Sequence, residues 1–159
     1  MITKSFRADF KIYNQFEEIV YKDKANLVNY IDFDDSQNQM VGKVKKKEVY
    51  NSTKEFKYLY AVEYTNSWGR FELQKGRQFA NYETIKINDK AYNTAKFNDN
   101  YLIKSLDQND KYAYIQITYY AKGIGMVKYE RFAPTGEIRI LELEAILSIE
   151  EFNELKKKK

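Results

Sequence analysis

Hydrophobic and polar residues alternate with a period of two along most of the chain, which is typical of the strands of an antiparallel sheet. The densest such stretch runs from Lys111 to Ala133, where two runs rich in Tyr, Ile and Val flank Gly123 and Gly125. Glycine within a strand pattern permits a bend or a bulge. We therefore expect two long strands joined at a structural kink formed by Gly123 and Gly125, with a third strand following from Glu137.

Similar patterns extend this sheet over residues 25–147, with turn-forming residues between the runs. Gly76 is expected to end one strand, and the polar stretch 97–100 is consistent with a loop before the next apolar residues. The sequence contains a single Pro, so long uninterrupted strands are permitted. The strands expected before residue 90 cover residues 27–33, 40–50, 56–65, 70–75 and 79–87.

The two ends of the chain carry helical signals. Apolar residues within 5–22 recur near a period of 3.6, so we expect a short amphipathic helix inside an N-terminal segment of residues 1–24. The competing interpretation is a strand at residues 10–12. At the other end, Ser148 and Glu151 have the spacing of a capping box, which predicts a short helix and a lysine tail within residues 148–159.

Taken together, these patterns predict one domain covering residues 1–159 with a mainly β fold. The expected architecture is a large curved antiparallel sheet or a partly closed β-barrel, with short N- and C-terminal helices. The length of 159 residues suits a single domain with a sizeable core.

Composition excludes several kinds of catalytic chemistry. The chain contains neither Cys nor His, so it has no thiolate nucleophile, no Ser-His-Asp triad and no Cys-based or His-based metal site. We expect no cofactor and no metal, and we do not expect an enzyme. The formal charge of +4 comes from the four lysines at the C-terminus, so the remainder of the chain is close to neutral.

Three other arrangements resemble functional motifs but have simpler interpretations. Residues 32–38 place oxygen ligands at alternate positions, as in a calcium loop, yet Gln37 occupies the position of the required Gly. The lysines of 43–47 could contact nucleic acid, but they also suit an edge strand, so we disfavour nucleic acid as a partner. Glu142 and Glu144 resemble paired catalytic carboxylates, although alternation in this strand explains them. Three arginines would bind an anion if they converged, which their spacing does not predict: Arg77, Arg131 and Arg139.

Tyrosine is unusually abundant, with 15 residues, and several lie on shared strand faces. A Tyr ring can pack against apolar groups while its hydroxyl remains hydrated. Such faces could line an apolar cavity, or they could form an ordinary core. The predicted ligand or partner surface comprises Tyr58, Tyr60, Tyr64, Tyr112, Tyr114 and Tyr120.

The stretch Tyr119–Glu130 reads YYAKGIGMVKYE and is followed by a turn containing Gly136 and by a Leu-rich last strand. This pattern resembles the TapB-like group of bacterial envelope proteins, a domain of unknown function. The resemblance covers residues 25–147 and is specific over 119–143. It implies a curved antiparallel sheet related to lipoprotein carriers, and often a lipoprotein. It supplies no catalytic residues.

The expected function is therefore a non-catalytic, lipoprotein-like envelope module that binds an apolar small molecule, a lipid or another protein on a curved sheet. The alternative is a structural or interaction subunit of a larger assembly. The N-terminus lacks the layout of a secretory signal. An envelope location, in the periplasm or at the outer membrane, thus requires that a leader was removed from the native precursor. That precursor could carry a lipid anchor. Without a removed leader, the expected location is the cytoplasm. No apolar run approaches the ~18 residues of a membrane-spanning helix.

Overall fold

The structure is a computed structural model that describes residues 2–6, 10–51 and 58–157. These residues form ten strands and one helix in chain order. Their bounds are β1 Ile2–Phe6, β2 Ile12–Val20, β3 Lys24–Phe33, β4 Gln39–Asn51, β5 Tyr58–Asn66, β6 Gly69–Ile87, β7 Lys90–Ser105, β8 Lys111–Ala121, β9 Gly125–Phe132, β10 Ile138–Glu142 and α1 Ile149–Lys157.

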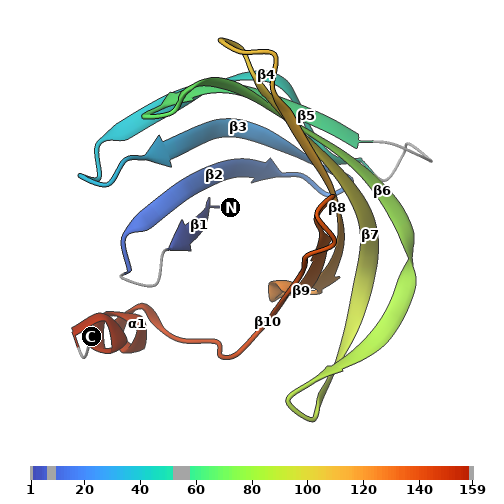
Figure 1. The fold of residues 1–159 in the computed structure, drawn as a ribbon. Helices are drawn as coiled ribbons and strands as arrows, with labels where there is room; N and C mark the ends of the chain where they lie inside the picture. The colour runs from blue at the N-terminus through green and yellow to red at the C-terminus, as the bar shows by residue number, and fades with distance from the viewer. Residues whose placement is uncertain (1, 7–9, 52–57, 158–159) are drawn as a thin grey trace.

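All ten strands belong to one antiparallel sheet whose strand order is the same as the chain order. The sheet curls into an open half-barrel, and β1 and β10 are its two free edges (Figure 1). The prediction of a large curved antiparallel sheet is confirmed. After β10 the chain leads to α1, where the ring of Phe152 lies 5.9 Å from that of Phe10, measured between centroids.

Two long strands, β6 and β7, replace the interrupted strands expected from the sequence. Gly76 does not end a strand, because its backbone pairs with Leu59 of β5 on one side and with Asn100 of β7 on the other. The expected loop at residues 97–100 is likewise wrong, since these residues pair with both β6 and β8. Neighbouring strands on both sides override the local preference of Gly, Asn and Asp for turns.

The expected N-terminal helix is also wrong, because the described residues of this segment form β1 and β2. The competing interpretation, a strand near residue 12, is closer to the structure. A register shift against β3 lies between Glu17 and Glu18. A bulge of this kind interrupts the period of two, so the apolar residues of β2 acquire a spacing that imitates a helix.

The C-terminal helix and its capping box are confirmed. The Ser148 amide donates to Glu151 Oε2 at 2.7 Å, and the Glu151 amide donates to Ser148 Oγ at 3.2 Å. Two amide groups at the start of α1 thereby gain acceptors, which stabilises a short and largely exposed helix.

Gly123 and Gly125 form part of the tight turn that joins β8 to β9. Both have positive φ, +77° and +106°, and an added Cβ would meet nothing within 4 Å at either position. Their role is therefore conformational rather than steric. The expected junction of two strands is found here, and a register shift lies beside it, between Tyr119 and Tyr120.

The concave face of the half-barrel carries the larger core. Its apolar part is built by β3, β4, β5 and β6, with Leu27 and Val62 almost completely buried. Phe16 of β2 packs against the same cluster. A second, smaller cluster includes Ile87, Tyr119 and Val127.

Gly42 of β4 is a position where the close packing of this core can be tested. An added Cβ would lie 2.8 Å from Tyr30 Cδ1 and 2.8 Å from Val62 Cγ1. We expect Gly42→Ala to lower the free energy of unfolding by about 1–3 kcal/mol, because the core would be overpacked. Urea denaturation measures this change.

Gly76→Ala is the matched control, since its Cβ would meet only a backbone oxygen of Asn100 at 4.0 Å. It should leave stability unchanged or raise it by about 0.5 kcal/mol, through lower entropy of the unfolded chain. Equal effects of the two substitutions would contradict this account of the packing.

Candidate functional site

A row of polar side chains crosses the concave face of the half-barrel. Arg77 of β6 pairs with Asp99 of β7, Asp99 pairs with Gln116 of β8, and Gln116 pairs with Arg131 of β9. Side chains directly opposite one another on paired strands share a face of the sheet. The antiparallel register therefore brings together four residues that lie far apart in the sequence.

The centre of this row is the carboxylate of Asp99, whose side chain is completely buried. Arg77 Nε donates to Oδ1 at 2.7 Å, and Arg77 Nη2 donates to Oδ2 at 2.9 Å. Lys75 Nζ lies 2.9 Å from Oδ2, and the Thr118 hydroxyl donates to the same oxygen at 2.8 Å. One carboxylate thus accepts from two buried cations, each about 6–7% exposed, and from a hydroxyl.

The network continues across β8 to β9. Gln116 Nε2 donates to the Thr118 hydroxyl oxygen at 3.1 Å, while Arg131 Nε and Nη2 donate to Gln116 Oε1 at 3.1 and 3.0 Å. Arg77 and Arg131, which the sequence gave no reason to connect, therefore belong to one hydrogen-bonded chain. Arg139 lies elsewhere, in an exposed ion pair with Glu137.

Aromatic rings surround both buried cations. Lys75 Nζ lies 4.8 Å from the ring centroid of Tyr101 and 5.9 Å from that of Tyr60. The guanidinium carbon of Arg77 lies 5.0 Å from the Phe97 ring and 4.9 Å from the Tyr120 ring. Aromatic faces attract cations, so these rings offset part of the hydration that Lys75 and Arg77 lose on burial.

Burial and charge pairing have opposite effects on the pKa values of this cluster. Burial by itself would raise the pKa of Asp99, but the charge of Lys75 and the hydrogen bonds from Arg77 outweigh it and lower this pKa to about 2. Burial and the nearby charge of Arg77 lower the pKa of Lys75, and Asp99 opposes both effects. Asp99 is therefore an ionised structural partner at neutral pH and a very weak base.

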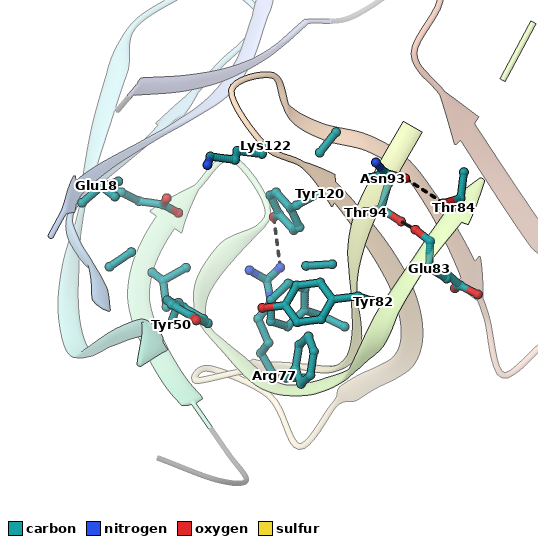
Figure 2. Close-up of a pocket in the computed structure, with 17 residues that line it drawn as sticks. Glu18, Tyr50, Arg77, Tyr82, Glu83, Thr84, Asn93, Thr94, Tyr120 and Lys122 are labelled. Carbon is teal, nitrogen blue, oxygen red and sulfur yellow. Dashed lines mark hydrogen bonds between the residues drawn. The ribbon is translucent and has the colours of Figure 1, made fainter. Parts of the chain in front are cut away.

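A pocket of about 830 Å³ opens beside this network on the concave face. Figure 2 shows Glu18 and Tyr50 on one side of the pocket, with Arg77, Tyr82 and Tyr120 across from them. Nη2 of Arg77 donates to the Tyr120 hydroxyl at 3.1 Å, which holds this ring at the pocket wall. The apolar part of the lining comprises Val20, Ala25, Val49, Phe79, Ala95, Phe97 and Ala121.

The structure describes the surroundings of five of the six tyrosines predicted to form a ligand or partner surface. Tyr120 lines the 830 Å³ pocket. Tyr60 belongs to the apolar core, and Tyr64 packs against it. Tyr114 stacks on Tyr101 with ring centroids 4.5 Å apart. Tyr112 is 44% exposed and contacts Tyr114. The backbone of Tyr58 begins β5, but its side chain lies outside the part that the structure describes.

The sequence interpretation missed Lys75, Asp99 and Thr118 as members of a site. Lys75 and Arg77 alternate in phase with Leu73, which is buried on the same strand. A continuous strand through Gly76 would therefore have placed two cations on an inward face, and this signal was present in the sequence. Asp99 gave no such signal, because its flanking asparagines are typical of a turn.

Within residues 2–6, 10–51 and 58–157, no cluster of three or more Asp and Glu side chains is arranged to hold a metal ion. The helix within these ranges, α1, is neither long enough nor apolar enough to cross a membrane.

Comparison with solved structures finds two proteins that are similar to this chain, each with a TM-score below 0.5. A candidate lipoprotein from Parabacteroides distasonis is 12% identical over 86% of this chain and 88% of its own, with a TM-score of 0.47. A candidate exported protein with a YmcC-like fold from Bacteroides fragilis is 15% identical over 87% of this chain and 90% of its own, with a TM-score of 0.40. No protein-family model and no curated protein matches the chain. The resemblance of residues 119–143 to TapB-like proteins therefore stays a prediction.

The dependence of the fold on Asp99 can be tested by Asp99→Asn. This change leaves Lys75 and Arg77 buried side by side without their counter-charge, so we expect a loss of about 3–5 kcal/mol in the free energy of unfolding. Urea denaturation at neutral pH measures the loss.

The control is Glu137→Gln, which also removes a carboxylate bound to an arginine, but at an exposed position. It should produce little measurable change, because solvent screens exposed ion pairs. Equally small effects of Asp99→Asn and Glu137→Gln would show that the buried network does not support the fold.

Proposed function

We propose that the protein is a non-catalytic binding module of the bacterial cell envelope that takes an apolar ligand into the concave pocket of its half-barrel. The observation that carries this proposal is the pocket itself. Its volume of about 830 Å³ lies within the range of small-molecule sites, and its lining combines hydrocarbon and aromatic groups with a few polar side chains. Such a lining favours a hydrocarbon ligand that is fixed by one polar end.

The chemistry of the charged residues supports a binding role rather than catalysis. Asp99 is completely buried, accepts from three neighbouring side chains and has a pKa of about 2, so it is poorly suited to accept a proton at neutral pH. Lys75 and Arg77 are engaged with this carboxylate. These groups maintain the shape of the sheet beside the pocket.

The envelope location in this proposal is supported by the resemblance of residues 119–143 to TapB-like proteins. Fractionation of the source cells, followed by detection of this chain, measures its location. Recovery with the cytosol would contradict an envelope module and would leave the pocket proposal standing.

Filling the pocket should remove ligand binding. Ala95 lines the pocket and pairs with Tyr120 across β7 and β8. We expect Ala95→Trp to abolish the binding of 1-decanol, a neutral apolar probe, because an indole would occupy the space that the hydrocarbon needs. Isothermal titration calorimetry and ligand-detected NMR measure the binding.

The matched control is Asn98→Trp, which adds the same side chain to an exposed position on the same strand. Asn98 does not line the pocket, so this variant should bind 1-decanol as the unmodified protein does. Failure of the unmodified protein to bind 1-decanol, or retention of binding by Ala95→Trp, would overturn the proposed site.

A specific observation also favours the second candidate function, an interaction subunit of a larger assembly. At the free edge strand β10, Ile138, Ile140 and Leu141 are each more than half exposed. Exposed apolar edges readily add a strand from a protein partner. Light scattering of the protein in extracts and after purification tests this function, and a monomer under both conditions would contradict it.

A further inference from the structure

Two arginines face each other across the last two strands of the sheet. Arg139 of β10 lies outside the hydrogen-bonded network, but its backbone pairs directly with that of Arg131 on β9. Residues opposite one another on paired strands share a face, with Cβ atoms about 5 Å apart. This face is the concave one, because Arg131 is also opposite Gln116 of the polar row. Like charges in this arrangement destabilise a sheet, and an anion that binds both would relieve the repulsion.

Arg131 is half-buried and has no carboxylate partner within the part of the chain that the structure describes. Its Nε and Nη2 groups both donate to Gln116 Oε1, which is a neutral acceptor. The guanidinium carbon lies 4.5 Å from the ring centroid of Tyr114 and 5.2 Å from that of Tyr129. A guanidinium carries five N–H donors. Arg131 therefore keeps donors and a full positive charge for a further acceptor.

Arg139 is exposed, and the carboxylate that it contacts is exposed as well. Its Nε lies 2.7 Å from Glu137 Oε1, and more than half of each side chain is accessible to solvent. Solvent screens such an ion pair, which contributes little to stability. Because the contact uses Nε, the two terminal nitrogens of Arg139 remain for other acceptors.

The other acidic residues close to these strands are bound to other cations. Glu130 and Glu142 lie 3.1 and 2.9 Å from Lys128 Nζ. These three residues alternate with the two arginines, so their side chains lie on the opposite face of the sheet. Asp99 shares the concave face, but its carboxylate is held by two buried cations on β6. Among the described residues, the concave side of β9, β10 and their turn thus carries two positive charges and one exposed carboxylate.

Tyrosines border this pair of arginines. Tyr129 contacts Arg131, and both Tyr112 and Tyr129 lie close enough to Arg139 to interact with it electrostatically. The Tyr112 ring is 44% exposed, and its centroid lies 5.7 Å from that of Tyr114. A ligand at the arginines would therefore meet an accessible aromatic face and hydroxyl groups that can donate hydrogen bonds.

We propose that Arg131 and Arg139 together bind a phosphate monoester, whose terminal oxygens accept from both guanidinium groups. Such a group carries about −1.5 to −2 charges at neutral pH and has three acceptor oxygens, which suits two arginines. Guanidinium groups bind phosphate through paired hydrogen bonds. The organic part of the ester lies against the exposed ring of Tyr112. Neither arginine lines the 830 Å³ pocket, so this site does not depend on the proposed function.

The test titrates the full chain with phenyl phosphate in low salt at about pH 7.5, where the ester is largely a dianion. Isothermal titration calorimetry measures the binding. Phenyl sulfate is the comparison probe, because it has a similar shape and a single negative charge. We expect phenyl phosphate to bind about tenfold more tightly, since its second charge strengthens the interaction with two cations.

Two substitutions at exposed positions change the charge of the site in opposite directions. Arg139→Gln should weaken phenyl phosphate binding by about tenfold, because it removes charge-assisted hydrogen bonds. Glu137→Gln removes the competing carboxylate and should tighten this binding.

The matched control is Arg70→Gln. Arg70 is also an exposed arginine paired with a carboxylate, that of Asp107. It lies an odd number of residues from Arg77 on β6, so its side chain is on the opposite face of the sheet. Arg70→Gln removes the same charge from the chain and should leave phenyl phosphate binding unchanged.

Co-sedimentation with phosphatidylcholine vesicles that contain or lack phosphatidate identifies the source of the phosphate group. Binding that requires phosphatidate and is lost in Arg139→Gln would support the site and indicate a lipid headgroup. Binding of phenyl phosphate without binding to these vesicles would support the site and indicate a soluble ester.

Three results would overturn the proposal. The first is a lack of binding to both phenyl phosphate and phosphatidate vesicles. The second is equal weakening by Arg139→Gln and Arg70→Gln, because binding would then follow the overall charge of the chain. The third is equal affinity for phenyl phosphate and phenyl sulfate, which would reject a phosphate monoester as the ligand class. The binding of 1-decanol in the pocket is measured separately, so none of these results decides the proposed function.

Discussion

The half-barrel depends on one carboxylate that two buried cations share. Lys75 and Arg77 could not lie inside the sheet without Asp99, because an unpaired buried charge is strongly destabilising. The same contact fixes the pairing of β6 with β7, since a shift of one residue would direct Asp99 to the opposite face. Gln116 and Thr118 extend this requirement to β8, and Arg131 extends it to β9. The polar network therefore determines register where an apolar core would tolerate alternatives.

The two sides of the concave face contribute differently to stability and to function. The apolar side, around Leu27 and Val62, buries hydrocarbon and supplies the general driving force for folding. The polar side carries charges whose burial costs free energy. These charges contribute by fixing the register of the strands rather than by driving folding. The pocket lies at their junction, so that a hydrophobic wall and a cationic group face the same space. This combination is what a ligand with two chemically distinct ends requires.

An element could be predicted from the sequence when the residues that determine it lie close together in the chain. The capping box of Ser148 and Glu151, and the turn at Gly123 and Gly125, are encoded within a few residues and were predicted correctly. The continuity of β6 through Gly76 depends on pairing with β5 and β7, which local propensity does not contain. Asp99 was not predicted for two reasons: its sequence neighbours are typical of a turn, and its interaction partners lie on other strands. The bulge in β2 explains the remaining error, since it gave a strand the spacing of a helix.

The identity of strand order and chain order has a consequence for how this molecule is assembled and how it can vary. Each hairpin can close as soon as its own two strands have been synthesised, because no pairing waits for a distant part of the polypeptide. The sheet can therefore grow from one side to the other during translation. For the same reason, a terminal hairpin can be gained or lost in evolution while the central strands keep their mutual alignment. The architecture can thus be extended at its margins without a change in the geometry of its centre.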